Sequence, residues 1–249
     1  MTKGMGKLAE CVAERTVESD RRIEAILARH CAPVLFERKP AALLGSRAVP
    51  EKYHDADLSR YGMRVLRLTS TNRPLLLLFY RPDLLAQTLA QPCVCRALHT
   101  LGYPDVRAGQ WERLLRVLQQ RFLESSEFPH EVGLFLGYPV TDVLGFISCK
   151  GKGCKLCGLW KVYGDVEGAR RRFAEFAQLR NTLCTFVQNG GSIKSIMGNN
   201  ASISIKSTMG ATTSGTVGGN THSMELSNAV GGRPPVPAAN TVNLSKMVG

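Results

Sequence analysis

The sequence predicts a single mixed α/β domain, in which a small sheet of three or more strands is flanked by amphipathic helices, followed by a low-complexity tail. Three observations lead to this fold class. Residues 63–82 contain two short runs rich in branched and apolar residues, which is typical of strands. Residues 110–122 carry apolar side chains at helical spacing. Beyond Val187 the composition changes abruptly.

The first helix is predicted from Leu8 to about His30, where apolar residues recur at a loose helical period between charges. Pro33 and Pro40 then interrupt helix propagation. Cys31 is therefore expected at a junction between a helix and a loop.

Two strands are expected next, on either side of a turn at residues 70–72. The stretch Leu75–Tyr80 is continuously apolar, as in a strand that is buried on both faces. Pro82 and Asp83 suit the first turn of a helix, and a further helix is expected from Pro92 to about Gly102.

A local repeat marks the second half of the body: LGYPDV at residues 101–106 returns as LGYPVTDV at residues 136–143. Each copy offers a glycine that can end an element in a left-handed conformation, followed by a proline that suits the start of the next helix. Leu159–Tyr163 is predicted to be a strand, and a last helix is expected after Asp165.

The domain is predicted to cover residues 8–187 and the tail residues 188–249. Of the 61 residues from Asn189 onward, 32 are Gly, Ser, Thr or Asn and none is aromatic. Such a composition buries too little apolar surface to offset the entropy of ordering, so a flexible tail is expected. The alternative is an ordered second domain, because SIKSIMG at Ser192 recurs as SIKSTMG at Ser204.

The formal net charge of +12 favours anionic partners. Nucleic acid is not expected, because the basic residues are scattered and no known nucleic-acid-binding motif is present. The N-terminus has no apolar signal core, and no run approaches the roughly 20 apolar residues that span a bilayer. We therefore expect a cytoplasmic protein whose eight cysteines are reduced.

Four blocks of the chain carry a resemblance to a known family: CAPVLFERKPAALL at Cys31, LLLLFYRPDLL at Leu75, FPHEVGLFLGYPVTDVLGFI at Phe128 and CGLWKVYGDVEGARRRF at Cys157. In this order they resemble the domain of unknown function 3793, an uncharacterised bacterial family known mainly from anaerobic Firmicutes. The resemblance covers residues 23–184 and implies an intracellular bacterial α/β domain without a transferable activity. The first block departs from the family's usual CAPTLAGIK, and the tail lies outside the resemblance.

Cys31, His130 and Glu131 form the first candidate site, as a thiol nucleophile with an imidazole and an orienting carboxylate. Because catalytic groups are recognised by geometry, their separation in sequence does not decide whether they meet. The alternative is that Cys31 is a buried small residue and that the other two begin a helix after Pro129.

Cys149, Cys154 and Cys157 are candidate metal ligands, because a C-x-x-C pair can place two thiolates on one ion. Zinc or an iron–sulfur cluster would need further ligands, and no second matching pair follows. The pair could also cycle as a dithiol, and unliganded reduced cysteines are the alternative.

Candidate ligands for a small anion lie in three places. The loop KGKGCKLCG supplies Lys150 and Lys152, and the strand after it supplies Lys161. Tyr80 and Arg81 end the apolar strand, where ligands gather in open α/β sheets. Lys39 follows the first helix. Solvated basic turns and an arginine that reaches solvent are the alternatives.

Two functional hypotheses follow. The first is an anion-binding site built from Tyr80–Arg81, His130–Glu131 and the lysine–glycine loop, with thiol chemistry at Cys31. The second is a non-catalytic protein that binds a metal through its cysteines or recruits partners through its tail.

Overall fold

The computed structural model describes residues 20–45, 47–53, 57–70, 73–106 and 109–198. Within them, a three-stranded antiparallel sheet is formed by β1 (Ala41–Gly45), β2 (Arg64–Ser70) and β3 (Arg73–Tyr80). The strand order is β1-β3-β2, so β3 lies in the centre. The mixed α/β fold class predicted from the sequence is confirmed.

The central strand is buried on both faces, which explains its continuous apolar run. Leu76, Leu78 and Tyr80 belong to one hydrophobic core, whereas Leu77 and Phe79 belong to another on the opposite face. The alternation follows from the two-residue period of a strand.

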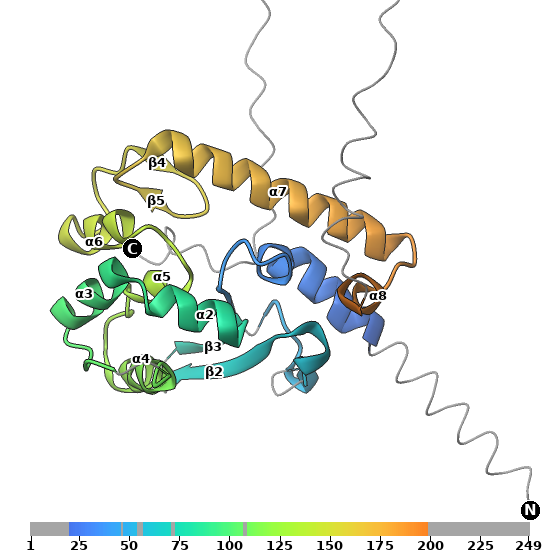
Figure 1. Cartoon of the computed structure of the whole chain (residues 1–249), viewed down its shortest axis with the longest axis horizontal. Coiled ribbons are helices and arrows are strands. Elements are labelled where there is room, and N and C mark those ends of the chain that lie inside the picture. Colours follow the sequence, from blue (N-terminus) through green and yellow to red (C-terminus); the bar gives the residue numbers. More distant parts are fainter. Residues whose placement is uncertain (1–19, 46, 54–56, 71–72, 107–108, 199–249) are drawn as a thin grey trace, which may run out of the picture.

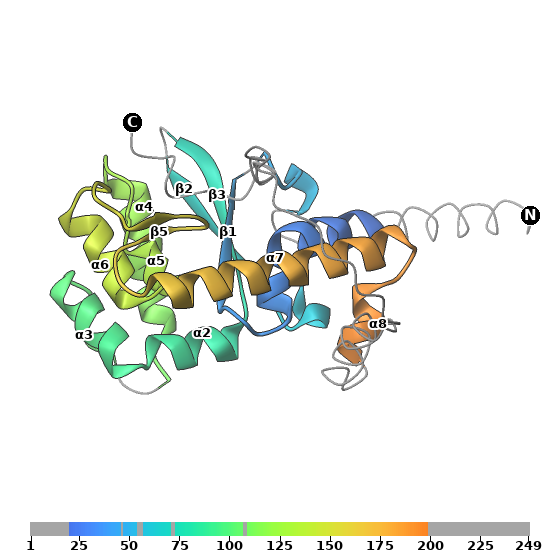
Figure 2. The same ribbon diagram turned by 90° about the horizontal axis from the view of Figure 1, so that it is seen from above.

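Helices on the first side of the sheet follow in chain order, and Figure 2 shows them grouped beside it. They are α2 (Pro82–Leu89), α3 (Pro92–Thr100), α4 (Glu112–Glu124), α5 (Val132–Phe135) and α6 (Val140–Ser148). The core on this side contains the inward residues of α4 that the sequence predicted, and α4 packs closely against β2.

On the other side of the sheet, the second core joins the N-terminal helix, whose described part is residues 20–35, to two C-terminal helices. These are α7 (Val166–Gln188) and α8 (Ile193–Gly198). Helix α7 runs along the molecule from a small hairpin at its start to α8 at its end (Figure 1). Two short 3-10 turns, η1 (Glu51–Tyr53) and η2 (Ser59–Tyr61), lie between β1 and β2.

The hairpin consists of β4 (Leu156–Cys157) and β5 (Lys161–Val162). The predicted strand at residues 159–163 is thus shorter than expected. Helix α7 begins at an N-cap, where the Asp165 carboxylate accepts a hydrogen bond from the Gly168 amide at 2.9 Å.

The two LGYP copies end elements as the sequence predicted. Gly102 after α3 has φ +79° and Gly137 after α5 has φ +76°, both in the left-handed region that favours glycine. Pro139 then serves as the N-cap of α6, whereas Pro104 of the first copy starts no helix, since α4 begins only at Glu112.

Three local predictions differ from the structure. The first helix continues through Pro33 to residue 35, so Cys31 lies inside a helix rather than at its junction with a loop. Strand β1 was not predicted, because Pro40 and Gly45 made this short segment look like a loop.

Residues 193–198 form α8 although they belong to the predicted tail, and Ile193 is buried in the second core. Residues 1–19 and 199–249, which include the start of the predicted first helix and most of the predicted tail, lie outside the described residues. No helix in the described part of the chain combines the length and the apolar character needed to cross a membrane.

Candidate functional site

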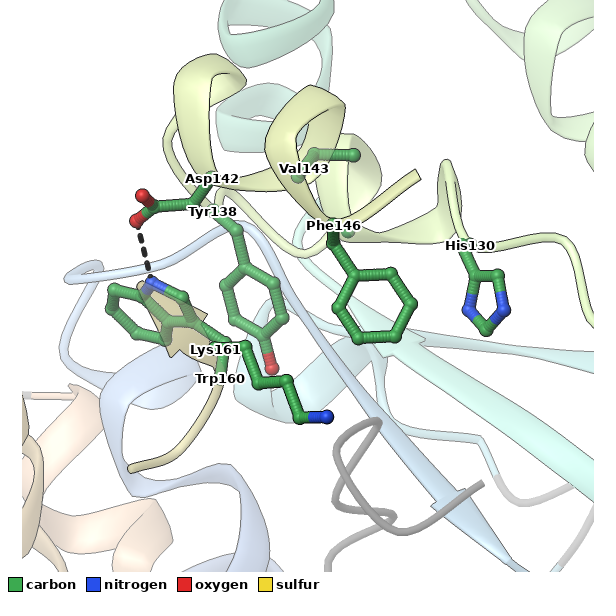
Figure 3. Close-up of a pocket in the computed structure, with 8 residues that line it drawn as sticks. His130, Tyr138, Asp142, Val143, Phe146, Trp160 and Lys161 are labelled. Atoms are coloured by element: carbon green, nitrogen blue, oxygen red, sulfur yellow. Dashed lines mark hydrogen bonds between the residues drawn. The ribbon is translucent and has the colours of Figure 1, made fainter. Parts of the chain in front are cut away.

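A small pocket lies where α5, α6 and the hairpin meet, and Figure 3 shows its side chains. Its cavity volume of about 20 Å³ is room for about one water molecule, so it can enclose only a small group. The lining residues are His130, Gly133, Tyr138, Asp142, Val143, Phe146, Trp160 and Lys161.

Asp142 holds the hairpin onto α6. Its Oδ2 accepts a hydrogen bond from Trp160 Nε1 at 2.8 Å, drawn as the dashed line in Figure 3. Its Oδ1 accepts from the amides of Tyr163 and Gly164, both at 2.8 Å. Three N–H donors therefore satisfy this buried carboxylate, as a buried charge requires.

Aromatic rings form one wall of the pocket. The Tyr138 ring stacks on Trp160 with centroids 4.7 Å apart. The ring of Phe173 in α7 packs edge-to-face on the same Trp160 ring, with centroids 4.5 Å apart. Because Trp160 is also held by Asp142, the position of Tyr138 is fixed by several contacts.

Lys161 brings a positive charge into the pocket from β5. Its Nζ donates to the Gly151 carbonyl at 2.7 Å and lies 5.7 Å from the centroid of the Phe146 ring. In Figure 3 its ammonium and the Tyr138 hydroxyl lie at the same side of the pocket. One backbone acceptor leaves two of its three N–H donors for other acceptors.

Lys39 places a second ammonium near the aromatic wall. Its Nζ lies 5.3 Å from the centroid of the Tyr138 ring. The next residue, Pro40, packs closely on Gly137. A Cβ on that glycine would come within 2.5 Å of the proline Cδ. Burial lowers the pKa of Lys39 to about 8, and the nearby Cys31 thiol opposes the shift. Lys39 is half-buried, and it lies outside the lining of the pocket.

Neither lysine has an ion pair with a carboxylate among the residues that the structure describes. The buried carboxylates, by contrast, are used by the fold. Glu24 accepts hydrogen bonds from Tyr61, from the Ser192 hydroxyl and from the Lys194 amide.

Cys31 is fully buried in the second core. Burial raises the pKa of its thiol to about 12, and the positive charge of Lys39 only partly opposes this. At neutral pH the thiol form dominates, whereas a nucleophile requires the thiolate.

His130 and Glu131 are adjacent in sequence but contact different groups. Glu131 Oε1 accepts from Arg121 at 2.9 Å and from the Tyr103 hydroxyl at 3.2 Å. The His130 ring packs 4.7 Å from that of Phe146 and lines the same pocket as Lys161. Of this pair, only His130 therefore lines a pocket together with Lys161, and Glu131 contacts Arg121 and Tyr103 instead.

Arg81 lies in a different place, at the end of β3. It pairs with Glu37 at 2.7 Å and donates to the Tyr61 carbonyl at 3.2 Å. The preceding Tyr80 packs edge-to-face on Trp111 at 6.2 Å, and burial raises its pKa. Since the sheet is antiparallel, its neighbouring strands do not end at one edge, and the strand-end rule that suggested this site does not apply.

The lysine–glycine loop uses its own amides. The N–H groups of Lys150, Gly151 and Lys152 donate to the carbonyls of residues 147, 146 and 149. The side chains of both lysines are exposed. The loop therefore offers no free amide at these three positions.

The cysteines of the hairpin form a pair rather than a triplet of ligands. The Sγ atoms of Cys154 and Cys157 are 3.1 Å apart, and Cys149 is exposed at the end of α6. Within the described ranges, no three Cys, His, Asp or Glu residues are grouped as metal ligands.

Sequence reasoning included His130 and Lys161 but missed Tyr138, Asp142 and Trp160 as site residues. One signal for Asp142 was available: a lone carboxylate in the apolar stretch VTDVLGFIS, which would be buried only with donors to satisfy it.

A family model described as "Protein of unknown function (DUF3793)" matches residues 27–197, more than half of the 249-residue chain. No curated protein and no solved structure matches the chain. The four sequence blocks lie entirely within the matched residues, together with the pocket, both lysines and the cysteine pair. The chain therefore belongs to the DUF3793 family.

Proposed function

We propose that this protein binds a small anion, a carboxylate or a phosphate group, at the pocket between α6 and the hairpin. Lys161 supplies charge and hydrogen-bond donors inside the pocket. Lys39 supplies a second charge beside the same Tyr138 ring.

The observation that carries the proposal is the difference in charge pairing around this pocket. Asp142 accepts hydrogen bonds from three N–H donors, while neither lysine has a carboxylate partner in the described part of the chain. A buried or partly buried ammonium without a counterion is costly. An anionic ligand would supply the missing counterion, and the charged hydrogen bonds would be worth about 1.5–3 kcal/mol each.

The size of the pocket limits the ligand. A cavity volume of about 20 Å³ encloses little more than one water molecule, so an anionic group would place about one of its oxygen atoms inside it and the rest at its mouth. The rings of Tyr138 and Phe146 offer apolar contact to the adjoining part of a larger molecule. Lysine recognises such a group as a point charge, so carboxylate and phosphate share this chemistry.

Thiol chemistry at Cys31 gains no support from its surroundings, because the thiol is buried and its pKa is raised. Binding alone is therefore the function that we propose for this pocket.

Thermal unfolding in sodium phosphate, sodium acetate and sodium chloride at one ionic strength would test the proposal. Ligand at about 100 times its Kd stabilises the native state by about 2.7 kcal/mol, which raises Tm by about 5–10 °C in a domain of this size. We expect a saturable rise with phosphate or acetate, but not with chloride.

Two variants that each remove one positive charge locate the effect. We expect Lys161→Met to lose the rise, measured from its own Tm, and Lys150→Met to keep it, because Lys150 is exposed outside the pocket. If both variants keep the rise, or if both lose it, the anion binds elsewhere or only screens the net charge of +12. If neither phosphate nor acetate raises the Tm of the wild type, the proposal is contradicted.

A further inference from the structure

The cysteine pair of the hairpin lies outside the lining of the anion pocket. Cys154 Sγ and Cys157 Sγ are 3.1 Å apart, and a disulfide needs about 2.05 Å. A shift of about 1 Å therefore separates the dithiol from the bonded state. Cys157 is exposed and Cys154 is partly exposed, so a reagent from solvent can reach the pair.

The hairpin keeps the two thiols together. Cys157 pairs with Lys161 across the two strands, and the Lys155 amide donates to the Val162 carbonyl at 2.8 Å. Gly158, next to Cys157, lies so close to the Phe173 ring that a Cβ would clash with it. Because both sides of the pair are anchored, the short distance between the thiols is a property of the fold.

Tyr163 adds a polar group beside the thiols. Its hydroxyl is buried and has no hydrogen-bond partner among the described residues. Its pKa is raised, first by burial and then by the proximity of Cys154, Cys149 and Cys157. No hydrogen bond joins this hydroxyl to either thiol, and the contact with the Cys154 thiol is the first cause that raises the pKa of Cys157.

We propose that Cys154 and Cys157 form a thiol–disulfide exchange site that reacts with a low-molecular-weight disulfide. The short separation of the two thiols, their exposure and their anchored hairpin support this exchange site independently of the anion pocket.

The reaction has two steps. The exposed Cys157 loses its proton to solvent, and its thiolate attacks one sulfur of the small disulfide, which forms a mixed disulfide and releases one small thiolate. The Cys154 thiolate then attacks Cys157 Sγ, which forms the Cys154–Cys157 disulfide and releases the second small thiolate. The protein loses two electrons and two protons, and the small disulfide is reduced to two thiols.

Glutathione buffers applied to the full chain test the proposal, with acid quenching, alkylation of free thiols and peptide mass spectrometry. An internal disulfide depends on the ratio of oxidised glutathione to the square of reduced glutathione, whereas a mixed disulfide depends on the simple ratio. Diluting both forms tenfold at a constant ratio should therefore raise the oxidised-to-reduced ratio of the pair about tenfold. The exposed Cys149 and Cys93 should show no such rise.

Single variants identify the order of attack. In Cys154→Ser the internal disulfide is lost and Cys157 should accumulate as a mixed disulfide with glutathione. In Cys157→Ser the internal disulfide is also lost, and Cys154 should be modified more slowly because it is less exposed. Cys149→Ser should leave the tenfold response unchanged.

Two results would overturn the proposal. One is a wild-type protein in which Cys157 forms only a mixed disulfide that does not respond to dilution. The other is a pair that stays fully reduced while the exposed Cys149 is oxidised in the same buffer.

Discussion

Buried carboxylates and half-buried lysines have different partners in this protein. Asp142 and Glu131 are both buried, and each accepts hydrogen bonds from at least two groups of the fold. Lys39 lies near the Tyr138 ring and Lys161 near the Phe146 ring, and neither pairs with a carboxylate among the described residues. The carboxylates therefore hold the structure, whereas the two lysines have no carboxylate partner within the described ranges.

The end of β3 strengthens this comparison. Arg81 is also a basic residue in a predicted anion site, but Glu37 already neutralises it. A basic residue is a candidate ligand only where the fold has not supplied its counterion.

The largest effect is expected for Asp142→Ala. It would leave the donors on Trp160, Tyr163 and Gly164 without their acceptor. We expect the free energy of unfolding to fall by about 3–5 kcal/mol. Urea unfolding measures this change, and a loss below about 1 kcal/mol would show that the carboxylate does not hold the hairpin.

A smaller loss is expected for Glu131→Gln, which leaves Arg121 facing a neutral amide in a partly buried position. We expect a loss of about 2 kcal/mol in urea unfolding. The matched control is Glu37→Gln, which weakens the pair with Arg81. Because the Glu37 side chain is 62% exposed, the control should lose less than about 1 kcal/mol. Equal losses would remove the distinction between the two pairs.

Lys39→Met should have the opposite sign, because it replaces an ammonium that burial disfavours with an apolar chain of similar length. The pKa of Lys39 is about 8 in the folded protein, whereas an unperturbed lysine, as in the unfolded chain, has 10.5. The unfolded state therefore binds more protons between these two pH values. Wild-type stability therefore rises with pH in this window.

We expect the Lys39→Met variant to be more stable than the wild type at pH 7, and the difference to shrink as the pH rises from 8 to 10.5. Urea midpoints of both proteins across this range measure it. A difference that does not change with pH would mean that Lys39 is not destabilised by burial.

Much of the fold could be predicted from local patterns. The central strand, α4 and α7 all follow from apolar periodicity, and the turns at Gly102 and Gly137 follow from the LGYP repeat. Strand β1 could not be predicted, because its five residues gain their strand conformation from pairing with β3. Likewise, α8 could not be predicted, because Ile193 lies in a polar stretch of the sequence and is buried only by packing into the second core.

The site was predicted only in part, for a related reason. His130 and Lys161 were both candidates, and they line one pocket. The partner of Arg81 is Glu37, 44 residues earlier, and no local pattern relates them. Tyr138 and Trp160 were missed because their stacking depends on how the hairpin folds back onto α6.

The central proposal is that a ligand supplies a counterion to Lys39 and Lys161, which have none among the residues that the structure describes. The pKa of Lys39 tests it most directly, by NMR titration of ¹³C-labelled lysine side chains with assignment from the Lys39→Met variant. With saturating phosphate or acetate, whichever stabilises the protein, the pKa of Lys39 should rise above its value of about 8, because an adjacent anion favours the charged form. The exposed Lys150 should not change, and an unchanged pKa of Lys39 would contradict the account.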